Sequence, residues 1–307
     1  MRYPLQIRRF TLLLLVALFS LAALAQSSAF KPGTPVLMWK VSSKTNTAYL
    51  LGSVHVGDKS MYPLPDVIED AFDAASVLIV EVDMTKVNQA QLQQLMMTLG
   101  SYPEGDDLFQ HISPRTRARL DTFLGQYGIP PAAFAQYRPW LAALSVTMFP
   151  MIKAGLNPSE GIDMYFLNKA KGKRIEQLED AEWQVKLFAE FPEKVSDAVL
   201  SRSIIQAASI NEHYAKLASL WSHGDAVKID ELTKSWSAGE SAEERAFDRR
   251  LREERNPHMT QKLEQCLQSS ETCFMVVGAA HVIGSQGIVK QLQAHGYRVQ
   301  QAVVGAK

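Results

Sequence analysis

Ala48-Tyr-Leu-Leu-Gly52-Ser-Val-His55 and Cys273-Phe-Met-Val-Val-Gly278-Ala-Ala-His281 are two versions of one phrase, placed near opposite ends of the chain. Each is an apolar run typical of a β-strand, which breaks at a glycine and delivers a histidine three residues later. Glycine permits a turn that a Cβ atom would obstruct. Histidine is suited to metal ligation or proton transfer near neutral pH. We therefore expect His55 and His281 to share one site.

The segments beside the two phrases have the order of an α/β domain. Val36–Ser42 and Thr47–Leu51 predict a hairpin, residues 65–75 have helical spacing, and Val77–Asp83 is typical of a buried strand. Strand, helix and strand in this order favour an α/β fold.

The C-terminal segment returns to the same order. Cys273–Val277 predicts a strand, residues 284–295 a helix that stops at Gly296, and Tyr297–Val304 a final strand. We expect the two ends of the chain to form one sheet.

The middle of the chain is predominantly helical in pattern. A short alternating run, Arg174–Leu178, predicts one strand, whereas residues 181–268 show only amphipathic helical spacing. We predict a single domain over residues 26–307. Its sheet core comes from segments of about 34–83 and 272–304, with a helical insertion of about 84–268.

Residues 1–25 have the layout of a secretory signal. Three arginines flank the apolar stretch Leu12–Leu24, and small residues suited to cleavage end at Ala25. The stretch is shorter than the ~20 apolar residues of a transmembrane helix. We expect a periplasmic or secreted protein without a stable membrane anchor; an uncleaved N-terminal anchor is the alternative.

The charge of the chain excludes an electrostatic footprint for nucleic acid. Removing residues 1–25 leaves 29 basic and 32 acidic residues, a net charge of −3. Nucleic-acid-binding domains are typically basic. We expect no nucleic-acid partner.

Two cysteines, Cys266 and Cys273, lie seven positions apart in the mature chain. An even number of cysteines at short spacing in an exported protein favours a disulfide. The bridge would join the end of a helix to the strand of the second phrase. The alternative is two free buried cysteines.

Glu81 is the carboxylate most suited to join the two histidines. It follows the apolar run Val77–Val80, and the carboxyl ends of parallel strands meet in one crevice. A buried carboxylate requires a partner such as a metal or an arginine. Alternatively, Glu81 has already reached solvent. Asp83 is expected to point the same way but to be more exposed.

Arg255 and Asn256 lie at a joint between two predicted helices. Asn256 followed by Pro257 has the pattern of a helix N-cap, which would explain Asn256 without a functional role. Arg255 could clamp a carboxylate or an oxyanion, or belong to a solvated charged face. Serine hydrolase elbows, phosphate loops and dinucleotide fingerprints do not occur in the sequence.

The chain resembles the TraB/GumN family, in its bacterial exported branch. The resemblance lies in the two Gly-x-x-His phrases, Glu81, Gly161-Ile-Asp163 and Arg255-Asn256. That family is similar to the Tiki proteins, which are regarded as metal-dependent proteases, and more distantly to erythromycin esterases and haem-binding ChaN proteins. The resemblance implies an α/β core with helical insertions. It implies a site of His55, Glu81 and His281 supported by Arg255, with Mn or Co as the ion and Zn as another choice.

Three functions are compatible with these residues. The first is a metal-dependent hydrolase, peptidase-like, in which His55 and His281 hold a divalent ion, Glu81 ligates the ion or acts as the general base toward its bound water, and Arg255 stabilises developing negative charge. The second is a non-catalytic periplasmic protein that binds haem or a peptide in the same crevice. The third is a metal-free hydrolase that uses His55 and Glu81 as acid and base. The sequence leaves the substrate and the oligomeric state open.

Overall fold

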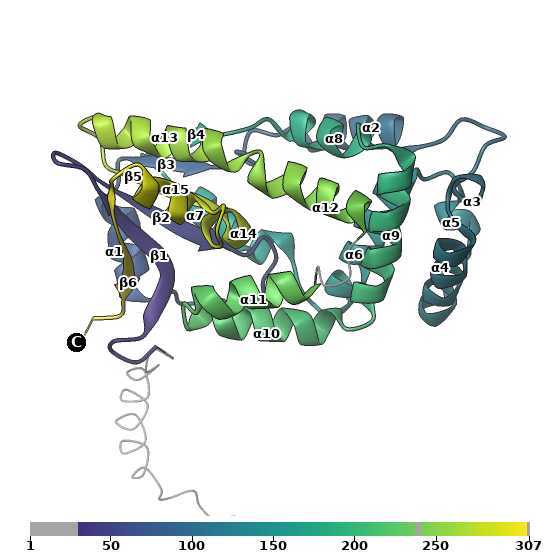
Figure 1. Ribbon diagram of the computed structural model, residues 1–307, viewed down its shortest axis with the longest axis horizontal. Coiled ribbons are helices and arrows are strands. Elements are labelled where there is room, and N and C mark those ends of the chain that lie inside the picture. The colour runs from purple at the N-terminus through teal and green to yellow at the C-terminus, as the bar shows by residue number, and fades with distance from the viewer. Residues whose placement is uncertain (1–29, 237–240, 306–307) are drawn as a thin grey trace, which may run out of the picture.

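A six-stranded sheet lies at one end of the protein in the computed structural model, which describes residues 30–236 and 241–305 (Figure 1). The strand order is β4-β3-β5-β2-β1-β6. The strands are β1 (Pro35–Ser42), β2 (Thr47–Ser53), β3 (Val77–Val80), β4 (Arg174–Gln177), β5 (Cys273–Gly278) and β6 (Arg298–Val303). The predicted signal, residues 1–25, lies outside the described residues.

The pairing of the strands confirms the predicted α/β class. Strands β2, β5, β3 and β4 are parallel, whereas β1 pairs antiparallel with both β2 and β6. The predicted N-terminal hairpin is therefore β1 and β2. Because β2, β5 and β3 are parallel neighbours, their carboxyl ends meet at one edge of the sheet.

Two details of the prediction change. Strand β4 was predicted as a short strand, but not as part of the sheet core. It lies within the segment predicted as the helical insertion, and it forms one edge of the sheet. The helix predicted over residues 284–295 is shorter, because α15 covers only Ile288–Ala294. A turn precedes it, in which Gly284 has φ +83° and a Cβ on Gly287 would lie 2.2 Å from the carbonyl oxygen of Ile283.

Helices cover both faces of the sheet. On one face lie α1 (Asp66–Ala74) and α7 (Ile162–Lys169), where Phe72 and Phe166 pack their rings against Phe274 of β5. On the other lie α13 (Asn256–Gln268) and α15 (Figure 1). Buried β-branched and aliphatic side chains between these layers form the main core.

A second core lies among helices beside the sheet, and it receives buried side chains from α3 (Leu108–His111), α4 (Pro114–Tyr127), α5 (Ala132–Ala135), α6 (Pro139–Lys153), α9 (Glu193–Ala207) and α12 (Ala242–Asp248). Helix α6 packs against α9, and α3, α4 and α5 lie farthest from the sheet (Figure 1). The other elements are η1 (Lys59–Met61), α2 (Gln89–Gly100), η2 (Pro158–Glu160), α8 (Ala181–Ala189), α10 (Ile210–Ser222), α11 (Ala226–Trp236), η3 (Arg249–Glu253) and α14 (Ala279–Val282). Of these, α10, α11 and α14 contribute buried side chains to the main core at the sheet.

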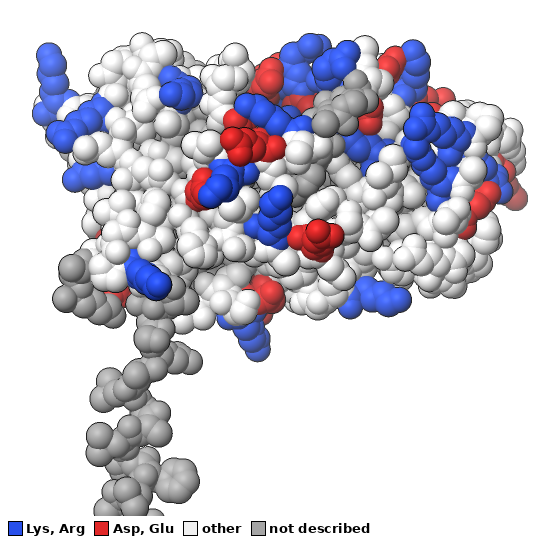
Figure 2. Space-filling view, turned by 60° about the horizontal axis from the view of Figure 1, so that its bottom comes forward, with Lys and Arg blue, Asp and Glu red and all other residues white. Residues whose placement is uncertain are grey.

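The surface and the helix lengths add two observations. Within the described ranges, no helix combines the length and the apolar character needed to cross a membrane. Figure 2 shows basic and acidic side chains interspersed on one face.

Cys266 and Cys273 form the predicted disulfide, which ties the last turn of α13 to the start of β5. Both residues are buried. Since α13 carries Arg255 at its N-terminal end and β5 carries Gly278 at its carboxyl end, the bridge fixes two elements that meet again at the candidate site.

We predict that the double variant Cys266→Ala/Cys273→Ala unfolds more easily than the wild type by about 2–3 kcal/mol, because the bridge restricts a short loop in the unfolded chain. Urea titration followed by circular dichroism measures the difference. Reduction of the wild-type protein should reproduce it, and an unchanged midpoint after reduction would contradict the prediction.

Candidate functional site

The carboxylate of Glu81 is the centre on which the site residues converge. Glu81 follows β3 directly and is 8 % exposed. Its Oε1 accepts a hydrogen bond from the backbone N–H of Gly278 at 2.8 Å, and its Oε2 accepts one from Arg255 Nη2 at 2.7 Å. The carboxylate is therefore buried and paired, as the sequence led us to expect for an acid behind an apolar strand.

His55 approaches Glu81 from the end of β2. Its Nε2 lies 3.9 Å from Glu81 Oε1, while its Nδ1 lies 2.9 Å from Asp163 Oδ2. The Nδ1–H group therefore donates to Asp163, which also accepts a hydrogen bond from Ser53 Oγ. Asp163 sits in the first turn of α7, which starts against the backbone beside His55, since Ile162 N donates to Val54 O. The side chain of His55 is 60 % exposed.

His281 approaches Glu81 from α14, on the other side. Its Nε2 lies 4.0 Å from Glu81 Oε2, and its Nδ1 lies 2.7 Å from Asn256 Oδ1. Asn256 Nδ2 donates to Gln286 O, so its Oδ1 is the acceptor and the proton of His281 sits on Nδ1. The N-cap interpretation of Asn256 is wrong: Asn256 is the first residue of α13, and its side chain orients His281 instead.

Arg255 lies between Glu81 and a second acid, Glu179. Its Nε and Nη2 donate to the two carboxylate oxygens of Glu179 at 2.7 and 2.6 Å. Its Nη1 donates to Leu251 O at 2.8 Å and to His281 Nε2 at 3.2 Å. Together with the bond to Glu81, these contacts engage all five N–H groups of the guanidinium.

The segment before Arg255 has an unusual backbone. Arg249–Glu253 forms a π-helix between α12 and α13. Such widened turns are frequent at functional sites. Here the π-helix supplies the Leu251 carbonyl that binds Arg255.

The two glycines of the repeated phrase provide space rather than a turn. Gly52 lies inside β2 and Gly278 ends β5, and neither has a positive φ. A Cβ on Gly278 would lie 2.9 Å from His55 Nε2, and one on Gly52 would lie 3.2 Å from the Cα of Ala279. The expected tight turn is therefore wrong, and the physical need for glycine is the close approach of site residues.

Asp83 differs from the expectation in exposure. It is 1 % exposed, less than Glu81, and its Oδ1 accepts from Thr85 while its Oδ2 lies 2.8 Å from Lys86 Nζ. The backbone turns after Glu81, so Asp83 does not emerge into solvent. Its carboxylate contacts are with residues close by in the sequence, and it does not join the two histidines.

The pKa values of the two histidines are shifted in opposite directions by their surroundings. The negative charge of Asp163 raises the pKa of His55 to about 10. Burial lowers the pKa of His281 to about 4, so that His281 is neutral at pH 7. Burial alone would raise the pKa of Glu81, but the neighbouring cationic groups and the Gly278 N–H lower it to about 2. Glu81 is therefore a stable anion and a weak base.

The donor atoms suit a divalent ion, but they do not yet surround one. Both imidazoles turn Nε2 toward Glu81 and have Nδ1 held by another side chain, which is the arrangement typical of metal-ligating histidines. Over the described ranges, however, no three His, Cys, Asp or Glu side chains are grouped so that they could hold a metal ion. Arg255 already occupies Glu81 Oε2, so an ion would require Arg255 to move.

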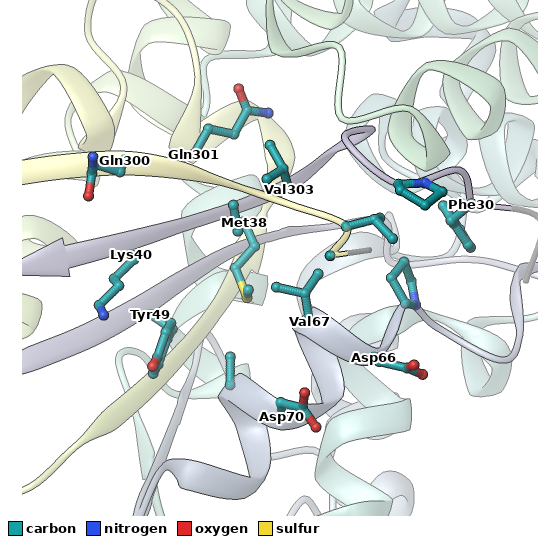
Figure 3. A pocket seen from close by; sticks show the side chains of 16 residues that line it. Phe30, Met38, Lys40, Tyr49, Asp66, Val67, Asp70, Gln300, Gln301 and Val303 are labelled. Atoms are coloured by element: carbon teal, nitrogen blue, oxygen red, sulfur yellow. The ribbon is translucent and has the colours of Figure 1, made fainter. Parts of the chain in front are cut away.

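A separate groove lies away from these residues. It has a volume of about 840 Å³ and lies between α1 and strands β1, β2 and β6, with Met38, Lys40, Tyr49 and Val67 among its lining side chains (Figure 3). None of the residues grouped around Glu81 lines it. The chemistry-bearing residues therefore lie elsewhere in the fold.

Sequence reasoning missed Glu179 and the roles of Asp163 and Asn256. Glu179 follows β4 by two residues, as Glu81 follows β3 by one, and both strands are parallel. An acid directly after a predicted parallel strand was therefore the signal that could have found Glu179.

The fold and the site together define an α/β domain in which two Gly-x-x-His segments meet a buried glutamate at one edge of a mixed sheet. The chain belongs to the TraB/PrgY/gumN family, whose model matches residues 37–301. The predicted family is thus confirmed.

Curated relatives of the chain are themselves uncharacterised. The chain is similar to the uncharacterised protein YbaP of Shigella flexneri, with 29 % identity over 149 residues, and to YbaP of Escherichia coli K12, with 29 % over 148 residues. Each match covers 48 % of this chain and 53 % of the relative. An uncharacterised protein of Treponema pallidum is 21 % identical over 170 residues, 55 % of this chain and 51 % of that protein. The chain thus spans about half the length of these relatives, and no solved structure matches it significantly.

We predict that Gly278→Ala displaces the His55 ring while costing less than about 1 kcal/mol of stability, because the exposed ring can rotate away from the new methyl group. Gly52→Ala should cost more, because its methyl group would press on the backbone at Ala279. Urea unfolding and the NMR chemical shifts of the His55 ring measure the two effects. Gly125→Ala, at an open helical position, is the control. Unshifted His55 resonances in Gly278→Ala would contradict the prediction.

We predict that the unfolding free energy falls as the pH falls from about 6.5 to about 4. In this range the unfolded chain binds a proton at His281 more readily than the folded protein, because the folded-state pKa is lowered from 6.5 to about 4. The shift corresponds to a loss on the order of 3 kcal/mol. Urea unfolding across this range should show a smaller loss for His281→Gln and an unchanged loss for the exposed control His223→Gln. An equal pH dependence in wild type and His281→Gln would refute the assignment.

Proposed function

We propose that the protein is an exported, metal-dependent hydrolase that acts on peptide bonds. The observation that supports this best is the matched presentation of His55 and His281. Both imidazoles direct Nε2 toward Glu81, and both have Nδ1 fixed by an acceptor, Asp163 in one case and Asn256 in the other. Fixed Nδ1–H groups leave the lone pair of each ring on Nε2, the nitrogen that would bind a metal, although His281 Nε2 here accepts a hydrogen bond from Arg255.

In this proposal His55, His281 and Glu81 hold a divalent ion, with Mn, Co and Zn as the candidates. When bound, such an ion supplies an activated water and a Lewis acid. Glu81 acts as a ligand and not as the general base, because a carboxylate whose pKa lies near 2 takes up protons poorly at neutral pH. His55 must lose a proton before it can ligate, since Asp163 favours its protonated form.

Arg255 supports this chemistry through charge. With all five N–H groups engaged, it has none left for a substrate oxygen in the present arrangement. Stabilisation of a developing oxyanion by Arg255 would therefore require it to release one of its contacts. Its present contribution is to balance the two buried carboxylates of Glu81 and Glu179.

A metal-free hydrolase is the second candidate, and the exposed His55–Asp163 pair favours it. A histidine whose Nδ1–H donates to a carboxylate and whose Nε2 reaches solvent has the geometry of an acid–base catalyst. The stretch Met148–Met151, a Met-rich run compatible with haem binding, belongs to α6, where Met148 and Met151 are half-buried and Phe149 is exposed.

We predict that the purified mature protein cleaves members of a peptide library in the presence of Mn²⁺ or Co²⁺ and stops after chelation, with recovery when the ion is restored. His55→Ala and His281→Ala should lose at least ~100-fold in rate and most of the bound metal, because each removes one of three ligands. Mass spectrometry of the library and metal analysis of the protein measure both effects.

His223→Ala, which changes an exposed histidine of another region, is the control variant. The same metal content in the wild type and in both site variants would refute the metal-dependent proposal. Cleavage that persists in chelator and is abolished by Asp163→Asn would support the metal-free candidate in its place.

A further inference from the structure

A second groove, with a volume of about 810 Å³, lies at the carboxyl ends of β3 and β4. Its walls are the loop after β3, the start of α2, the end of β4 and the start of α8. Helices α2 and α8 pack against each other beside the sheet (Figure 1). Open α/β sheets bind ligands outside the carboxyl ends of their strands, and ligand pockets have volumes of roughly 300–1,000 Å³. The groove therefore has the place and the size of a ligand site.

The groove adjoins the segments that carry Glu81 and Glu179. Beyond the strand ends these segments stay hydrogen-bonded, since the backbone N–H of Glu179 donates to Glu81 O at 2.9 Å. The backbone N–H of Asp83 then donates to Gln177 Oε1 at 3.2 Å, and both of these residues line the groove. The groove is thus built on the same strand ends as the candidate site, toward the edge strand β4.

Trp183 gives the groove an exposed aromatic face. It lies in the first turn of α8 and is 43 % exposed. A single exposed apolar residue needs no functional explanation by itself. This indole, however, lines a groove whose floor is packed, because Leu92 lines the same groove and contacts the buried cluster of Trp140, Leu141 and Val185. An indole in this position offers a flat and rigid surface to a ligand.

Side-chain amides and carboxylates line the groove together with Trp183. Gln91 Nε2 donates to Glu182 Oε1 at 3.1 Å, which joins α2 to α8. Gln177 Nε2 donates to Asp180 Oδ1 at 2.5 Å, which joins β4 to the segment before α8. These bonds hold the four side chains in place. They leave the second N–H of each amide and further lone pairs of each carboxylate for a ligand.

The charges of the groove favour an uncharged ligand. The carboxylate of Asp83 lies 2.8 Å from Lys86 Nζ, and that of Glu182 lies 4.0 Å from Lys186 Nζ. With Asp180 as the third acid, the lining has a net charge of −1. An anion would meet three carboxylates, and a cation would meet two ammonium groups.

We propose that this groove binds a neutral glycan, with one sugar ring stacked on Trp183. A pyranose ring has C–H groups on its faces and hydroxyl groups around its edge, so it is complementary to an aromatic surface beside amides and carboxylates. An extended peptide would be held by main-chain bonds along an open strand edge. The groove instead meets β4 through the side chains of Ile175 and Gln177, which lie on one face of that strand. Glycan binding here needs no metal ion and no hydrolysis, so it is independent of the proposed activity.

The test is the binding of neutral glycans to the purified protein in the presence of EDTA. A glycan array that includes cellotetraose, maltotetraose and N-acetylchitotetraose selects the probe, and isothermal titration calorimetry measures its affinity. We expect Trp183→Ala to weaken binding about tenfold or more, because it removes the stacking surface, and Trp183→Phe to retain most of the affinity. The indole N–H resonance of Trp183, identified by its absence in Trp183→Phe, should shift when the glycan is added.

Phe149→Ala is the matched control. Phe149 is an aromatic residue of α6 that is 39 % exposed and does not line the groove. Its replacement should leave the affinity for the glycan unchanged. Because Trp183 is also a surface residue, Trp183→Ala should unfold at the same urea concentration as the wild type, which separates lost binding from lost folding.

Equal affinity of the wild type and Trp183→Ala, or equal weakening by Trp183→Ala and Phe149→Ala, would overturn the role of Trp183. A wild-type protein that binds no glycan of the array would overturn the proposal as a whole. Binding of library peptides in place of glycans, lost in Trp183→Ala, would assign the groove to a peptide and contradict the glycan. Because these measurements are made in EDTA and without turnover, failure of the metal-dependent function would leave their outcome unchanged.

Discussion

Burial of the Glu81 carboxylate is the constraint on which the site depends. A carboxylate that is 8 % exposed behind a fully buried strand requires charge and hydrogen bonds from its surroundings. The structure supplies them from three directions: the Gly278 amide of β5, the guanidinium of Arg255 at the start of α13, and the imidazole of His55 after β2. Each of these groups belongs to a segment whose position the mixed sheet determines. The arrangement of the parallel strand ends therefore produces both the α/β core and the site.

The sheet explains why residues from opposite ends of the chain meet. Strand β5 lies between β2 and β3, so the C-terminal phrase enters between two N-terminal strands. Gly278 is the closest point of this insertion, because a Cβ there would contact both His55 Nε2 and Glu81 Oε1. The disulfide joins β5 to α13 at the other end of both elements. It thereby limits how far Gly278 and Arg255 can move apart.

Much of this was predictable, and the remainder shows what sequence patterns lack. The α/β class, the hairpin, β4 and the disulfide follow from local signals that each segment carries by itself. The meeting of His55, Glu81 and His281 followed from the rule that parallel strands share an edge. The hydrogen-bond partners of these residues did not follow from that rule. Asn256 has the local pattern of a helix cap but binds His281, and Glu179 and Arg255 are 76 positions apart. Such tertiary contacts leave no periodic trace in the chain.

The balance of charge connects the protonation of His55 to the binding of a cation. Three acids, Glu81, Glu179 and Asp163, face one permanent cation, Arg255, so the cluster carries a charge of −2 before His55 is considered. A proton on His55 reduces this to −1, which is the state that Asp163 favours. If His55, His281 and Glu81 held a divalent ion, as proposed, and His55 were neutral, the same cluster would carry no net charge. Binding of the ion would then be accompanied by loss of the proton of His55.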